Sequence, residues 1–161
     1  MNIDEFWKII EKVKESDEPE EIVCEELKKL TPNEIASYQE HFDSLHEKAY
    51  QWSLWGAAYV IEGGCSDDGF MDFRYGLISK GKHIYENALN NPDSLADLGA
   101  FVEISNESFG YTAHEVYEEI TGNEIPRKEL TGSREPIGQE WDFEDEAENI
   151  NRLPRLMKLH W

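Results

Sequence analysis

The chain has 161 residues, with 35 Asp or Glu against 15 Lys or Arg, so its formal net charge is −20. This length predicts one domain whose core is large enough to be stable without disulfides or a metal. The charge argues against DNA, RNA and anionic membranes as direct partners, because each presents negative phosphates. It favours a basic protein partner or divalent cations, or else serves solubility alone.

The two cysteines, Cys24 and Cys65, are too few for a disulfide framework. We therefore expect free thiols and a reducing, cytoplasmic compartment. The first thirty residues are rich in Glu and contain no apolar run, which predicts that no signal peptide is present. No stretch reaches the roughly 18 apolar residues of a membrane span, so we expect none.

Capping signals predict the first three helix starts: Asn2 with Glu5, Asp17 with Glu20, and Thr31 with Pro32 and Glu34. Apolar residues then recur three and four apart, which predicts one long amphipathic helix from Thr31 to Trp52. A fourth helix is expected over 54–62, ending at the glycine pair at 63–64.

Ser66 or Asp67 can cap a fifth helix that closes at Gly81, and a sixth is expected over 82–90. Residues 95–104 are also predicted to be helical. A capping box of Thr112 with Glu115 predicts another helix, with Gly122 as its stop. Residues 123–140 are predicted to be a loop, and a last helix runs from near 142 to 153, where Pro154 interrupts it.

These signals predict an all-α protein, an irregular single domain of seven to nine helices over residues 1–161. It would carry the loop at about 123–140 and a C-terminal helical segment at about 142–161. Charge is uneven, since residues 83–126 hold nine acids and no Lys or Arg, whereas the last ten residues hold three bases and no acid. We therefore expect the basic C-terminus to fold back onto the acidic body.

Residues 52–81 combine many aromatic rings with a Gly-Gly turn, a cysteine and paired aspartates. The motifs are W-G-A-A-Y at 55–59, G-G-C-S-D-D-G-F at 63–70 and P-D-S-L-A at 92–96, with F-W near the start and R-L-P-R-L near the end. With these motifs the chain resembles bacterial proteins of the domain of unknown function DUF4240. The resemblance implies a helical module without an established activity, and it supplies no catalytic residues.

Cys65, Asp67 and Asp68 follow the Gly-Gly turn and open a helix. A thiolate at a helix start can be reactive, but the adjacent carboxylates raise the thiol pKa, and a base such as His41, His46, His83 or His114 would be needed. We favour a structural role, in which Ser66 and the aspartates cap the helix and Cys65 packs as a small apolar group. For the catalytic alternative the candidates are Cys65, Asp67, Asp68 and Arg74.

Two roles are open for Arg74, a structural ion pair with an acid on another helix or recognition of an anion, and we favour the first. The candidate binding residues are Trp52, Trp55, Tyr59, Phe70 and Arg74, which could wall a ligand pocket. Aromatic residues at helical spacing more often form plain core, which is the interpretation we favour.

Metal binding has weak support. The Asp67–Asp68 pair lacks the order of a calcium loop. His114 and Glu118 share a helical face but do not form an HExxH motif, and His41 and His46 do not share a face cleanly. We expect no metal and no cofactor.

The sequence therefore predicts a small acidic cytosolic bacterial protein that acts as an interaction or regulatory module. Its partner would be a basic protein, in an immunity-like role suggested by charge and size, and neither nucleic acid nor membrane is expected. The alternative is an enzyme with a Cys/Asp/Arg cleft, with or without a metal.

Overall fold

The computed structural model describes residues 1–129 and 135–161. These residues form α-helices and two short 3₁₀ helices, and they contain no β-strand. The elements are α1 Ile3–Glu11, α2 Pro19–Leu27, α3 Pro32–Lys48, α4 Trp52–Glu62, α5 Asp67–Ser79, α6 Lys82–Asn90, η1 Pro92–Leu98, η2 Ser108–Gly110, α7 Thr112–Thr121, α8 Glu146–Arg152 and α9 Pro154–His160. The predicted all-α class is confirmed, and with the 3₁₀ helices counted the described residues hold slightly more helices than the seven to nine expected.

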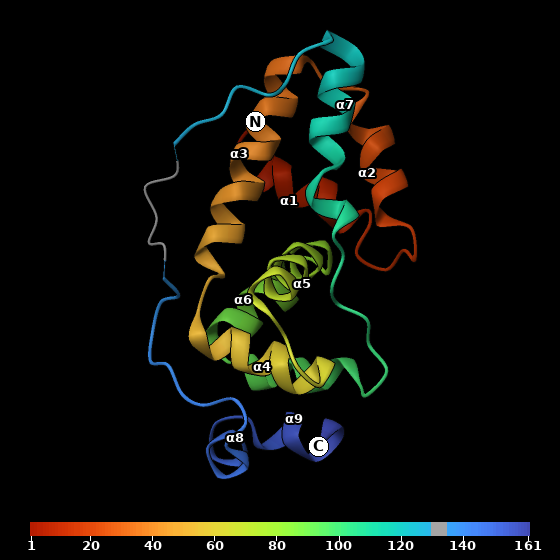
Figure 1. Cartoon of the computed structure of the whole chain (residues 1–161). Helices are drawn as coiled ribbons and strands as arrows, with labels where there is room; N and C mark the ends of the chain where they lie inside the picture. Colours follow the sequence, from red (N-terminus) through yellow and green to blue (C-terminus); the bar gives the residue numbers. More distant parts are fainter. Residues whose placement is uncertain (130–134) are drawn as a thin grey trace.

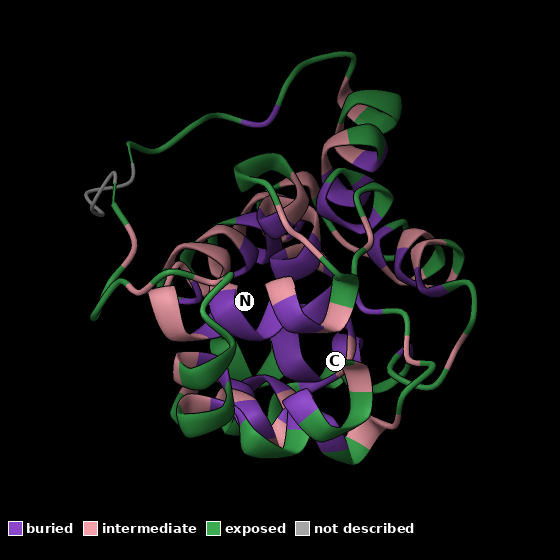
Figure 2. Ribbon diagram, turned by 60° about the horizontal axis from the view of Figure 1, so that its bottom comes forward, coloured by how far each residue is buried: buried purple, intermediate pink, exposed green. Residues whose placement is uncertain are grey.

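Helix α5 lies in the middle of the fold (Figure 1), between the group of α1, α2, α3 and α7 and the helix α4. It packs against α3, α4, α6 and η2, while α3 also packs against α7. The buried parts of the ribbon gather around this centre (Figure 2). The largest fully buried rings come from four helices: Phe6, Tyr38, Phe42, Phe70, Phe73 and Tyr85. Rings of this size bury much apolar area, so they anchor the core around α5.

Local capping chemistry sets several helix ends as predicted. Asn2 and Thr31 each form a capping box with the Glu three residues on. Helix α4 ends at Gly63, whose φ of 68° is the left-handed conformation that glycine adopts readily. Two predicted caps are wrong. Asp17 does not cap α2, which begins at Pro19 without a side-chain cap. Thr112 does not cap α7, because its hydroxyl donates to the carbonyl of Ser108.

The predicted long helix from Thr31 to Trp52 is interrupted. Helix α3 ends at Lys48, and α4 begins at Trp52. Between them the chain pairs with Ile137, whose N–H donates to the carbonyl of Tyr50 at 2.8 Å. The carbonyl of Ile137 in turn accepts the N–H of Trp52 at 3.0 Å. Since this partner is distant in sequence, helical periodicity alone gave no sign of the break.

Residues 95–104 do not form the expected α-helix. The chain forms η1 up to Leu98, and Gly99 then takes a φ of 86°, which ends it. The buried carboxylate of Asp93 in η1 accepts the N–H groups of Arg155 and Leu156, so it caps α9 from across the fold. This contact, together with an ion pair between Arg155 and Asp97, holds the C-terminus against the body as expected.

The predicted loop at 123–140 lies partly outside the described residues, and its described parts, 123–129 and 135–140, contain no helix. The predicted last helix is two helices, α8 and α9, and Pro154 begins the second of them. None of the helices in the described part of the chain has the length and apolar content needed to cross a membrane.

Two glycines of α5 give opposite predictions for stability. A Cβ at Gly76 would overlap the backbone carbonyl of Ile104, so we expect Gly76→Ala to destabilise the protein by about 3 kcal/mol. A Cβ at Gly69 would lie at ordinary distances, 3.4 Å from Ser66 Oγ, so Gly69→Ala should stabilise by up to about 1 kcal/mol. Urea unfolding of both variants measures the difference. Equal midpoints would show that α5 and the backbone at 104–106 do not approach closely.

Candidate functional site

The Gly-Gly elbow at 63–64 leads into α5 through Ser66. The hydroxyl oxygen of Ser66 accepts the N–H of Gly69 at 3.1 Å and so caps the helix. Both aspartates are exposed, and the carboxylate of Asp67 accepts the hydroxyl of Tyr50 at 2.9 Å. The elbow therefore uses Ser66, and not an aspartate, as the side-chain cap of α5.

Cys65 is half-buried beside the elbow, and its thiol makes a weak 3.7 Å contact with the carbonyl of Ser66. Burial, followed by the charges of Glu62 and Asp72, raises the pKa of this thiol to about 12. At neutral pH the sulfur is therefore protonated, and a protonated thiol is a poor nucleophile and a poor metal ligand.

Arg74 is buried, with only 7% of its surface exposed. Its Nη1 donates to the carbonyl of His46 at 2.9 Å, and its Nε donates to the carbonyl of Phe70 at 3.3 Å. The guanidinium lies over the rings of Tyr50 and Phe70, at 4.4 and 4.9 Å from their centroids. Burial lowers the pKa of Arg74, and the nearby Tyr50 and Asp67 oppose that effect. Backbone carbonyls and ring faces thus take the place of the direct carboxylate partner we expected.

The rings of Trp52, Trp55 and Tyr59, which were candidates for a pocket wall, are covered by a later part of the chain. Trp55 stacks on Trp52 at 5.3 Å and on Phe70 at 5.2 Å, with interplanar angles of 5° and 8°. Phe143 belongs to the C-terminal segment, which we define as residues 137–161. Its ring packs on Trp52, Trp55 and Tyr59 with centroid distances of 5.6 to 6.1 Å. The wall therefore serves as the seat of the C-terminal segment in this structure.

Trp141 of the C-terminal segment also packs against α4. Gly56 of α4 is the point of close approach, because a Cβ there would overlap the Trp141 indole ring. The indole N–H donates to the side-chain oxygen of Asn149 at 2.8 Å, and the guanidinium of Arg152 lies 4.5 Å from the ring centroid. Asn149 is fully buried and also donates to the carbonyl of Phe143 at 2.7 Å, which ties the segment together.

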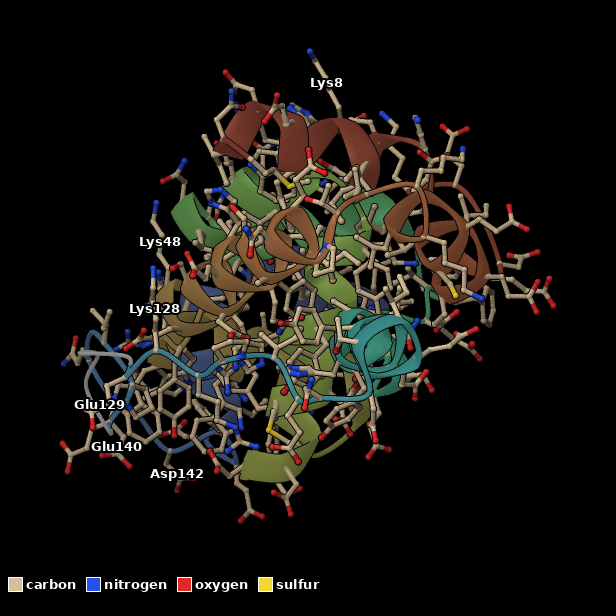
Figure 3. The ribbon with its side chains drawn as sticks, turned by 90° about the horizontal axis from the view of Figure 1, so that it is seen from above. Lys8, Lys48, Lys128, Glu129, Glu140 and Asp142 are labelled. Atoms are coloured by element: carbon tan, nitrogen blue, oxygen red, sulfur yellow. The ribbon has the colours of Figure 1, made fainter. Side chains whose placement is uncertain are left out.

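A polar pocket of about 630 Å³ lies between α3, α7 and residues 125–129, with Tyr75 of α5 contributing to its lining. Segment 125–129 runs outward from α7 past α3, to the side of the molecule where Lys128 and Glu129 are labelled in Figure 3. The lining residues that carry a polar side chain are Gln39, Glu40, Asp43, Ser44, His46, Glu47, Tyr75, His114, Arg127, Lys128 and Glu129.

His46 is held as a neutral acceptor in this pocket. Its Nε2 lies 3.1 Å from the carbonyl of Met71, which only accepts, so Nε2 carries the proton and Nδ1 carries the lone pair. The ring stacks on Tyr75 with 4.2 Å between centroids. Burial and the charge of Arg74 lower the pKa of His46 to about 4, so the ring stays neutral at pH 7.

Asp43 supplies a carboxylate to the lining of the same pocket. Gln39 donates to it at 2.7 Å, and this neutral amide is its single hydrogen-bond donor among the described residues. Burial raises the pKa of Asp43, whereas the Gln39 bond and the charges of His114 and Arg127 oppose the rise. The carboxylate is thus partly desolvated and lacks a paired cation in the described part of the chain.

Sequence reasoning named His46 and His114 as possible bases but did not connect them with Asp43 or Tyr75. One signal was available, since Gln39, Asp43 and His46 follow at helical spacing beside the apolar stripe of α3. The contributions of α5, α7 and segment 125–129 depend on tertiary structure. In residues 1–129 and 135–161 no group of three or more His, Cys, Asp or Glu is arranged to hold a metal ion.

The structure is thus an all-α domain with a polar pocket between α3, α7 and residues 125–129. Residues 1–119 match the family described as protein of unknown function (DUF4240), so the chain belongs to that family. No curated protein and no solved structure matches it. The match ends before segment 125–129 and before the C-terminal segment that covers α4.

The reactivity of Cys65 can be measured in a Cys24→Ser background, where it is the sole thiol. Because its pKa is raised to about 12, we expect iodoacetamide at pH 8 to modify native Cys65 at least about tenfold more slowly than the same chain unfolded in urea. Mass spectrometry of timed samples gives both rates. Faster modification of the native protein would instead indicate an activated thiolate and revive the catalytic alternative.

The seat of Trp141 can be tested by a double-mutant cycle. Gly56→Ala should destabilise the native chain by about 1–3 kcal/mol, because the new Cβ displaces the indole ring. In a Trp141→Ala background the same change should be neutral or slightly stabilising, because the obstacle is gone and Ala favours the helix. Urea unfolding of the four proteins gives the coupling. Additive effects would mean that Trp141 does not rest on Gly56.

Proposed function

We propose that the protein is a cytosolic interaction module that binds a basic protein partner, in a regulatory or immunity-like role. The observation that carries this proposal is the excess of carboxylates without a cation. Ion pairs among the described residues engage six of the 35 acids: Glu11, Glu26, Glu40, Asp97, Glu119 and Glu148. Most of the negative charge is therefore available to attract a basic surface, which accelerates association and favours cationic partners.

Four of the acidic side chains lie near the elbow: Glu62, Asp68, Asp72 and Glu107. We call them the elbow carboxylates. Burial, and then the charges of Glu107 and Asp68, raise the pKa of Asp72. A pKa raised by neighbouring carboxylates means that like charges repel there. Lys or Arg side chains of a partner would relieve this repulsion, which supports the elbow as a contact point.

The enzyme alternative has less support from the geometry. It needs Cys65, Asp67, Asp68 and Arg74 to act on a common substrate. Burial and nearby acids keep the thiol protonated, and the guanidinium of Arg74 is buried against two carbonyls and two rings. Neither group is free to bind or attack a ligand in this arrangement.

Charge reversal at the elbow tests the proposal. The protein would be immobilised and used to capture proteins from a lysate of its source cells, with elution by increasing salt and identification by mass spectrometry. We expect basic proteins whose retention falls steeply with salt, because the attraction between exposed charges is screened. Asp68→Lys with Glu107→Lys should reduce the capture by at least about tenfold, because each reversal replaces an attractive charge with a repulsive one.

The matched control is Glu15→Lys with Glu25→Lys, which makes the same change in net charge at two exposed positions that are not among the elbow carboxylates. Equal losses in the two double variants would mean that only total charge matters and that the elbow is not a contact point. Capture of neutral or acidic proteins, with retention indifferent to salt, would contradict the proposal as a whole.

A further inference from the structure

We propose that the pocket between α3, α7 and residues 125–129 binds one arginine side chain of the basic partner. The inference rests on the proposed function, because it assumes such a partner, and it names how one of its side chains is recognised. The pocket is distinct from the elbow carboxylates, which do not line it.

The charges that face the pocket favour a cation. Its lining holds four carboxylates, Glu40, Asp43, Glu47 and Glu129, against two permanent cations, Arg127 and Lys128. Lys128 already pairs with Glu40 at 3.0 Å. His114 also faces the space, and it and Arg127 act on Asp43 through their charges without a described ion pair. The balance is therefore negative, and Asp43 contributes a partly desolvated carboxylate to it.

The lining of the pocket also includes a neutral acceptor, the ring of His46. The Nδ1 of His46 has no hydrogen-bond donor among the described residues, while its Nε2–H is committed to the carbonyl of Met71. Burial, and then the charge of Arg74, lowers the pKa of His46, so the ring does not become a further cation that would repel the ligand. A carboxylate and an unprotonated imidazole nitrogen both accept hydrogen bonds, so they favour a ligand with several N–H donors.

An arginine side chain meets these requirements better than the alternatives. Its guanidinium has five N–H donors in one plane, so one ligand group can donate to several acceptors of the lining, among which are Asp43 and His46. The ammonium of lysine is compact and more strongly hydrated, so it satisfies fewer of these acceptors at once. An anion would gain Arg127 and His114 but would face the desolvated carboxylate of Asp43.

The test uses the full chain and three blocked tripeptides, acetyl-Ala-X-Ala-amide with X as arginine, lysine or citrulline. Citrulline keeps the shape of arginine but carries no charge. Isothermal titration should show the arginine peptide binding at least about tenfold more tightly than the citrulline peptide, because charge-assisted hydrogen bonds are lost. NMR spectra of the wild-type chain should show the ring signals of His46 and Tyr75 moving as the arginine peptide is added.

Asp43→Asn is the informative variant, because its amide oxygen can still accept from Gln39 while the charge is removed. It should weaken arginine-peptide binding at least about tenfold. Glu21→Gln, the same charge change at an exposed position of α2, should leave binding within about twofold. Ring signals that stay in place in the wild type would overturn the inference even if Asp43→Asn failed to fold.

Two further outcomes separate this inference from the function on which it rests. If Asp68→Lys with Glu107→Lys abolishes peptide binding and Asp43→Asn does not, the pocket assignment falls while the interaction module stands. If free L-arginine binds at least about tenfold more tightly than the blocked peptide, the pocket takes a small molecule and the partner side chain is the wrong ligand. Lysine binding as tight as arginine binding would overturn the choice of guanidinium.

Discussion

The position of one buried cation, Arg74, determines how the centre of the fold is assembled. Removing a guanidinium from water costs several kcal/mol, so such a group persists only with good compensation. Here two backbone carbonyls and two ring faces supply it, and they come from α3, α5 and the turn between α3 and α4. Because the guanidinium bonds the carbonyl of His46, it fixes the end of α3 against α5. Asp67 and Cys65 of the elbow act on this guanidinium, and His46, whose carbonyl it bonds, lines the polar pocket.

The C-terminal segment covers the aromatic face of α4. Helix α4 carries Trp52, Trp55 and Tyr59 around the small Gly56, and such a face would expose a large apolar surface if nothing covered it. Residues 137–161 provide the cover, with Trp141 and Phe143 against the rings and α9 capped by Asp93. The DUF4240 match covers residues 1–119, so the cover lies outside the matched part of the chain. The aromatic residues Trp52, Trp55 and Tyr59 are therefore explained by their packing against the C-terminal segment.

What the sequence predicted well depends on near neighbours along the chain. The caps at Asn2, Thr31 and Ser66 and the stop at Gly63 involve residues within a few positions, and all four are as expected. The break after Lys48 was missed because its cause, pairing with Ile137, is almost ninety residues away. The pocket was missed for the same reason, since it joins three helices and a connecting segment. The contacts of Arg74 could not be predicted from the residues around it in sequence either, because they include the carbonyl of His46 and the ring of Tyr50.

In the proposed interaction, the acidity and the pocket would serve different steps of recognition. Long-range attraction from many exposed carboxylates acts on any basic surface, is weakened by salt and mainly raises the rate of encounter. Such a field discriminates poorly, because a partner is judged only by its charge. A site with a desolvated carboxylate and a fixed imidazole acceptor discriminates by geometry, since a ligand with unmatched donors leaves buried groups unpaired. Arg74 connects the two regions, because its guanidinium acts on Asp67 at the elbow and, together with burial, lowers the pKa of His46 in the pocket. A change that moved this cation would therefore alter the shape of the specific site and the charge balance of the elbow together.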